Sequence, residues 1–157
     1  MSEYDSAEDT KAHIRCVAHY LEAVVHELCL RGGRHDASKL RPPEKEAFDR
    51  CTPKLKATVY GTPEYKEACR ELGPALKHHY ENNPHHPEFH VDGVCGMSLL
   101  DLIEMLCDWK AAGERHADGG DMMRSLDINA GRHNMPDAIR DVLQKTIEEM
   151  GWREPTS

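Results

Sequence analysis

Aromatic residues are scarce in this sequence: Phe, Trp and Tyr together account for 6% of the 157 residues. No stretch alternates regularly between apolar and polar residues, as a half-buried strand would. No apolar run approaches the roughly 18 residues that a membrane-spanning helix needs. The N-terminal segment MSEYDSAEDT is acidic and lacks the apolar core of a signal peptide. These absences argue against a sheet-based fold, a membrane protein and a secreted one.

Basic residues are outnumbered by acidic ones, and the formal net charge is -8. A protein that binds nucleic acid or an anionic membrane needs a basic surface, so we expect neither partner. A small phosphorylated substrate remains compatible, because a bound metal supplies local positive charge. The six cysteines show no C-x-x-C spacing, which argues against a zinc ribbon, and several lie among apolar residues as free thiols do. We therefore expect a reducing, cytoplasmic compartment, with a disulfide framework as the minor alternative.

The spacing of apolar residues predicts an all-α fold, a compact single-domain helical bundle over residues 1–157 with its core at about 8–150. Gly32-Gly33 should end the first helix, Gly73-Pro74 should bend a later one, and Ser98 should cap the most apolar one. The expected helices are about 6–30, from 35 to the Pro42-Pro43 pair, 44–51, 63–80, 99–116 (ended by Gly119-Gly120) and 136–150, with loops at 52–62 and 82–96.

The first helix carries three histidines, and only one of them lies near its apolar face. At about 100° per residue, His13 lies roughly 70° from the centre of that face, whereas His19 and His26 lie on the opposite side. We expect the apolar face to be buried, with His13 pointing inward, either as a ligand or as a hydrogen-bonded histidine of the core edge. The apolar residues are Ile14, Val17, Leu21, Val24, Val25 and Leu28.

The predicted helix from 99 to about 116 is apolar nearly all round, except for one acidic stripe. Asp101, Glu104 and Asp108 follow one another at i, i+3 and i+7 and therefore share a face. The stripe is either a thin strip facing solvent or the border of an internal polar site. In the second case the buried carboxylates need a cation to offset their desolvation.

Histidines are unusually frequent, with eleven in the chain. The stretch HHYENNPHHPEF holds two His-His pairs, and GGRHDASKL places His35 directly before Asp36. Neutral imidazoles and mixed histidine–carboxylate sites suit Zn, Fe, Mn, Co or Ni. The candidate ligands run along the chain in the order His13, His35, Asp36, His79 (or His78), His85 or His86, and Asp108 (or Asp101).

That order resembles the HD-domain superfamily of metal-dependent phosphohydrolases over roughly residues 10–110. HDASK is similar to the H-D-x-G-K form of their motif, with Ser38 in place of the glycine. Together with TPKLKATVYGTPEY, LKHHYENNPHHPE and LLDLIEMLCDWKAA, it looks close to a small uncharacterised family of HD-like proteins from phages and bacteria. The G-Y-P extension of cyclic-dinucleotide phosphodiesterases is absent from the sequence, which argues against that substrate.

The resemblance implies a set of metal ligands that hold one or two divalent transition metals. The implied ligands are His13, His35, Asp36, His79, His86 (or His85) and Asp108. Lys39 shares a helix face with Asp36 and would contact a phosphate oxygen. Asp101 or Glu104 would orient water or protonate the leaving group. Arg132 is either a second contact to the substrate or a surface arginine, and Glu44 and Glu46 are interpreted as a solvent-exposed helix start.

These residues predict a metal-dependent phosphohydrolase that acts on a nucleotide or another small phosphate ester, with a metal-activated water as nucleophile. An HD-type di-iron oxygenase would use the same order of ligands. A non-catalytic, metal-stabilised binding protein is the third possibility, and it predicts metal without turnover. A homodimer is compatible with each of them, because compact helical domains of this class often pair.

Overall fold

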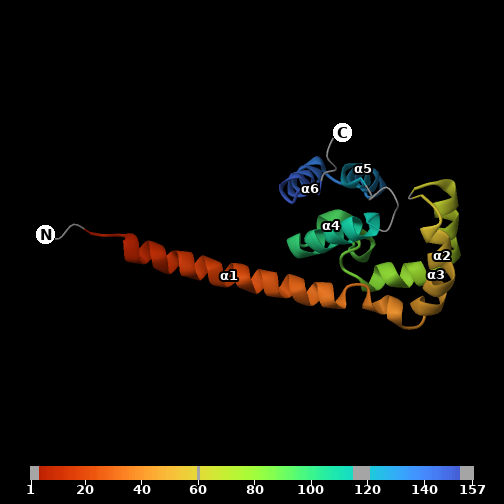
Figure 1. The fold of residues 1–157 in the computed structure, drawn as a ribbon, viewed down its shortest axis with the longest axis horizontal. Coiled ribbons are helices and arrows are strands. Elements are labelled where there is room, and N and C mark those ends of the chain that lie inside the picture. The colour runs from red at the N-terminus through yellow and green to blue at the C-terminus, as the bar shows by residue number, and fades with distance from the viewer. Residues whose placement is uncertain (1–3, 60, 115–120, 153–157) are drawn as a thin grey trace. The chain divides into compact units, whose positions relative to one another are not determined.

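The structure is a computed structural model that describes residues 4–59, 61–114 and 121–152. These residues form helices, turns and loops without a strand, which confirms the all-α prediction. Figure 1 shows the helices in chain order. The α-helices are α1 (Ala7–Arg34), α2 (Glu44–Lys56), α3 (Pro63–Asn82), α4 (Leu99–Gly113), α5 (Met122–Arg132) and α6 (Asp137–Glu149), and three short 3₁₀ helices are η1 (Ala37–Leu40), η2 (Pro87–Phe89) and η3 (Gly93–Gly96).

The chain divides into two units, Met1–His35 and Asp36–Ser157. The first unit consists of α1, which continues through Gly32 and Gly33 to Arg34, so the prediction that this pair ends the helix is wrong. No side chain of α1 is buried. The expected burial of its apolar face is therefore not seen, because the described part of the first unit, residues 4–35, holds no second element to cover it. The prediction of one domain over residues 1–157 stays a prediction.

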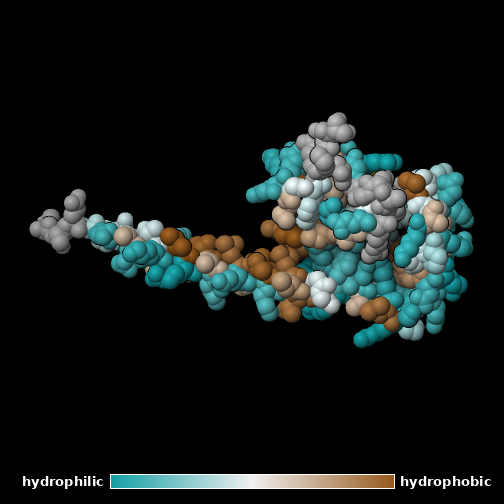
Figure 2. Space-filling model, viewed as in Figure 1, coloured by the Kyte–Doolittle hydropathy of each residue, from teal (hydrophilic) through white to brown (hydrophobic). Residues whose placement is uncertain are grey.

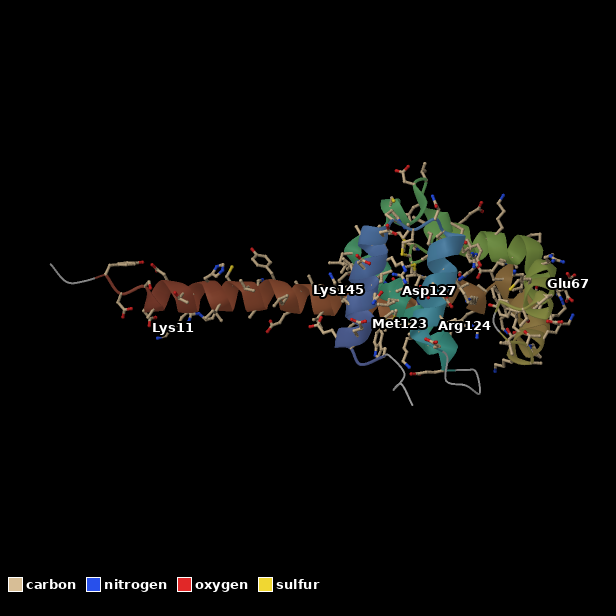
Figure 3. All side chains as sticks on the ribbon, turned by 90° about the horizontal axis from the view of Figure 1, so that it is seen from above. Lys11, Glu67, Met123, Arg124, Asp127 and Lys145 are labelled. Atoms are coloured by element: carbon tan, nitrogen blue, oxygen red, sulfur yellow. The ribbon has the colours of Figure 1, made fainter. Side chains whose placement is uncertain are left out.

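The second unit contains two groups of packed helices. α4, α5 and α6 surround one apolar core, and α5 contacts both α4 and α6. Its buried residues are Val94, Met105, Leu106, Met122, Leu126, Met135, Leu143 and Ile147. α2 and α3 pack on each other around a smaller core of Ala47, Cys51, Leu72 and Ala75. The Asp127–Arg140 ion pair, at 2.6 Å, adds a polar link between α5 and α6 (Figure 3 labels Asp127).

Several helix boundaries differ from those that the sequence predicts. α2 continues through Pro53 to Lys56, where a loop was expected, because Ala47 and Cys51 bury its apolar side against α3 and outweigh the proline. The segment 82–96 is not a plain loop but contains η2 and η3. α4 ends at Gly113, and the predicted breaker Gly119-Gly120 lies outside the described residues.

Other local predictions are confirmed. α3 bends at Gly73, which precedes Pro74. Its backbone conformation (φ 41°, ψ −117°) is one that glycine adopts more readily than other residues. Ser98 caps α4 by accepting a hydrogen bond from the backbone N–H of Asp101. No helix among the described residues is long and apolar enough to cross a membrane.

Candidate metal centre

Four side chains of the second unit converge on one point and could hold a metal ion. Asp36, His79, His85 and His86 each offer one ligand atom, and these four atoms lie within 4.8 Å of one another. The Nε2 atoms of His79 and His86 are 2.9 Å apart. Asp36 Oδ1 lies 3.3 Å from Nε2 of His79 and 3.5 Å from Nε2 of His85. Three imidazoles and one carboxylate are a donor set that suits a divalent transition metal.

The backbone at Asp36 fixes how its carboxylate faces the histidines. Asp36 is in the left-handed region (φ 57°) and precedes η1, a conformation that aspartate tolerates better than most residues. Lys39, one turn later, places its Nζ 2.6 Å from Asp36 Oδ2. Lys39 therefore binds one carboxylate oxygen, while the other, Oδ1, is the atom that lies beside the histidines.

The histidines come from the end of α3 and the turn that follows it. His79 is buried in the last turn of α3, six residues after the bend at Gly73. Asn83 ends the helix, and its side-chain amide donates to the carbonyl of His79 at 2.7 Å. The backbone N–H of His86 donates to the Asn83 carbonyl at 3.0 Å, which closes the turn. Helix end and turn together bring residues 79, 85 and 86 to one point.

Two glutamates lie behind these imidazoles, on the side away from Asp36. Glu44 Oε2 is 3.0 Å from His79 Nδ1, and Glu104 Oε1 is 3.3 Å from His85 Nδ1. An ionised carboxylate only accepts hydrogen bonds, so with a metal on Nε2 of each ring, Nδ1 would carry the proton and donate it to the carboxylate behind. Carboxylates in this position orient histidine ligands and raise their basicity. The arrangement thus turns the Nε2 atoms of His79 and His85 toward Asp36.

His86 is neutral in this environment. Burial, together with the nearby imidazoles of His85 and His79, lowers the pKa of His86 from 6.5 to about 3. Its ring also packs against Tyr80, with ring centroids 4.8 Å apart. A neutral imidazole needs to lose no proton before it binds a cation.

The structure distinguishes between candidates that the sequence leaves open. His79, rather than His78, lies in the cluster; His78 is partly exposed and contacts Glu44 through its Nδ1 at 2.7 Å. His85 and His86 both belong to the cluster, although the sequence led us to choose His86. On α4, Asp108 offers a ligand atom within 4.8 Å of one of His85.

Asp101, by contrast, serves the start of α4. Its Oδ2 accepts hydrogen bonds from the backbone N–H of Ser98 (2.8 Å) and from the Ser98 hydroxyl (2.7 Å), which completes a capping box. The acidic stripe of α4 thus has three different surroundings: Asp101 caps the helix, Glu104 contacts His85, and Asp108 lies beside His85. The interpretation of the stripe as the border of a polar site therefore fits Glu104 and Asp108.

Arg132 lies on α5 and contacts groups next to the cluster. Its Nη2 is 2.6 Å from Glu88 Oε1 and 3.2 Å from the Tyr80 hydroxyl, and the guanidinium lies over the Tyr80 ring. Since Tyr80 packs on His86, Arg132 connects to the histidines through one intervening side chain. Its predicted contact with a substrate stays a prediction.

His13 and His35 belong to the first unit. His35 is joined by its peptide bond to Asp36, and its role as a ligand stays a prediction. His13 is exposed on α1, roughly 30 Å from the end of that helix at 1.5 Å per residue. The predicted role of His13 as a ligand likewise stays a prediction.

A model of a protein family of unknown function, DUF5662, matches residues 2–150. The chain belongs to DUF5662. No curated protein and no solved structure matches it.

Sequence reasoning missed one central residue of this DUF5662 protein. Glu44 was interpreted as solvent-exposed, but it is fully buried, while Glu46 is exposed as expected. Glu44 accepts a hydrogen bond from the Ser38 hydroxyl (3.0 Å) and contacts His78 and His79. A signal was present in the sequence: Glu44 lies three residues before Ala47, on the apolar side of α2.

Proposed function

We propose that this protein is a metal-dependent phosphohydrolase that acts on a nucleotide or another small phosphate ester. The convergence of His79, His85 and His86 on Asp36 carries the proposal. The carboxylates behind two of the imidazoles support it, because surface histidines that gather by chance have no reason to be oriented from behind. The order of these residues along the chain also supports the likeness to the HD-domain superfamily.

The donor set fits one divalent transition metal, held by Asp36, His79, His85 and His86. Asp108 is a further candidate ligand, and His35 is added by the resemblance. A second metal would need ligands beyond these four. The donors are nitrogen and oxygen atoms, which favours Mn, Co, Ni, Zn or Fe over Ca or Mg.

A metal in such a site lowers the pKa of a bound water and offsets negative charge on a phosphoryl group. Lys39 would hold a phosphoryl oxygen as a point charge, because its Nζ already lies at the edge of the cluster on Asp36 Oδ2. Glu104 would act as a positioning residue that fixes the imidazole of His85. We place the enzyme in a reducing cytoplasm, in keeping with its six free thiols.

Elemental analysis of protein purified without chelator tests the site. We expect one or two transition metals per chain in the wild type and a loss of metal in Asp36→Asn. Asparagine keeps the side-chain shape and also tolerates the left-handed backbone at this position, so the change removes mainly the charge. Asp49→Asn is the matched control, because Asp49 lies on the surface in an ion pair with Lys45.

Hydrolysis of a panel of nucleotides and small phosphate esters then tests the activity. We expect phosphate release by the metal-loaded wild type and none by Asp36→Asn. Iron in the purified protein together with substrate-dependent oxygen uptake would instead establish the oxygenase. Stoichiometric metal without turnover on any class of phosphate ester would favour the non-catalytic binding protein. A folded wild type that neither contains nor takes up metal would refute the metal site itself.

A further inference from the structure

The apolar face of α1 has the residue spacing of a helix-pairing seam. Ile14, Val17, Leu21, Val24 and Leu28 follow one another at alternating intervals of three and four residues, which is the a/d pattern of a coiled coil. Brown, apolar residues are visible along the middle of this helix in Figure 2. The four residues from Ile14 to Val24 are 43–60% exposed.

Among residues 4–35, which the structure describes in the first unit, nothing covers this seam. An isolated helix gains little stability from propensity alone, and most helical stability in proteins comes from packing of an amphipathic face. α1 has 28 residues and no buried side chain, and its polar ion pairs, such as Lys11 with Glu8 at 2.8 Å, lie on the surface. Figure 3 shows its side chains, including Lys11, projecting from the helix. A seam of this length therefore requires a partner.

The charges at the two ends of α1 indicate the partner and its direction. The first turn carries Glu8 and Asp9, and the last turn carries Arg31 and Arg34. A second copy that runs antiparallel places each acidic turn beside a basic turn, whereas a parallel copy places like charges together. Antiparallel pairing also sets the two helix dipoles in opposite directions.

The seam itself suits a two-fold axis. Ile14, Val17, Leu21 and Val24 are symmetric about the midpoint between Val17 and Leu21, so in an antiparallel pair Ile14 of one copy faces Val24 of the other and Val17 faces Leu21. Such an interface uses the same patch on both copies and closes as a dimer. We propose that α1 pairs with α1 of a second copy of this chain as an antiparallel two-helix interface centred between Val17 and Leu21.

Sedimentation of the full chain over a wide concentration range, with reductant present, tests the proposal. Two paired helices bury less than the ~800 Å² per partner of a standard interface, so we expect a reversible dimer. Leu21→Glu should raise the dissociation constant by about tenfold or more, since it places one charge on each side of the centre of the seam, facing Val17 of the other copy. His19→Glu, on the polar face, introduces the same side chain and should leave the constant unchanged. Circular dichroism should show the same helix content in both variants.

A charge exchange tests the direction. Reversal of Glu8 and Asp9 to lysine should weaken the antiparallel dimer, and the additional reversal of Arg31 and Arg34 to glutamate should restore it. Constants that both changes leave unaltered would indicate a parallel pair and would overturn the antiparallel arrangement. A wild type that is monomeric at every concentration, or Leu21→Glu that dimerises as well as His19→Glu, would overturn the interface; another segment of the chain or another protein would then cover the seam.

Discussion

Glu44→Gln tests whether the carboxylate behind His79 sets the metal affinity of the cluster. Glu44 is fully buried and accepts from the Ser38 hydroxyl, while its two oxygens face Nδ1 of His78 and Nδ1 of His79. Glutamine has the same size but presents one oxygen and one NH₂ group. If the NH₂ group faces His79, the Nδ1 of that ring must accept, and the proton moves to Nε2, where it blocks metal binding.

The structure also bounds the size of the effect. His78 is partly exposed and can turn to water, so the amide oxygen of the substituted side chain can remain with His79 at the cost of the negative charge alone. Removal of a carboxylate behind a histidine ligand typically lowers metal affinity by about 10- to 100-fold. We expect a loss in that range, which corresponds to about 1.4–2.7 kcal/mol of binding free energy.

Competition with a chromophoric chelator measures the affinity, with Glu46→Gln as the control. Glu46 lies two residues away on the same helix, is exposed, and loses the same charge on substitution. Circular dichroism verifies that both variants fold. Equal metal affinities for the two variants would refute the reasoning, because they would show that the charge behind His79 has no influence on its Nε2 atom.

Three further predictions concern the pH dependence, the bend of α3 and the two aspartates of α4. The pKa of His86 is lowered to about 3 in the folded chain, so between about pH 6.5 and pH 3 this imidazole is protonated in the unfolded chain and neutral in the folded one. The unfolding free energy of the chelator-treated protein should therefore fall as the pH decreases through this range. Urea denaturation should show a smaller fall in His86→Gln. Gly73→Ala should destabilise the protein by about 1–3 kcal/mol, because Gly73 has a positive φ that alanine adopts with strain. Gly131→Ala should stabilise it by about 0.5–1 kcal/mol, because Gly131 lies within α5 and has space for a Cβ atom. Equal thermal midpoints for the two variants would contradict this. Asp101→Ala should lower the stability by about 0.5–2 kcal/mol and leave metal affinity unchanged, because Asp101 caps α4. Asp108→Ala should lower metal affinity, because Asp108 lies beside His85. Denaturation and chelator competition measure the two effects, and the reverse result would exchange the roles of the two aspartates.

The sequence predicted helices well where apolar residues or caps mark them strongly. α4 with its Ser98 cap and α6 begin within a residue or so of the expected positions. α5 was missed because Met122, Leu126 and Asn129 give it a short and partly polar buried side. Its start is nevertheless marked: Asp121 accepts from the backbone N–H groups of the second and third helical residues (Figure 3 labels these, Met123 and Arg124). Packing against α4 and α6, which no local pattern reveals, makes this segment a helix.

In the candidate site, the sequence predicted the residues that could bind the metal but not the buried glutamate that contacts them. Asp36 and the later histidines could be found because residues with donor atoms cluster in short stretches, and that clustering is visible in one dimension. The burial of Glu44 depends on how α2 lies against the end of α3, so its sequence neighbourhood reads as an ordinary charged helix start. A buried acid is costly unless donors surround it, and here Ser38 and two imidazoles do so. The burial of Glu44 therefore depends on the packing of α2 against α3, because this packing brings both imidazoles of α3 to its carboxylate.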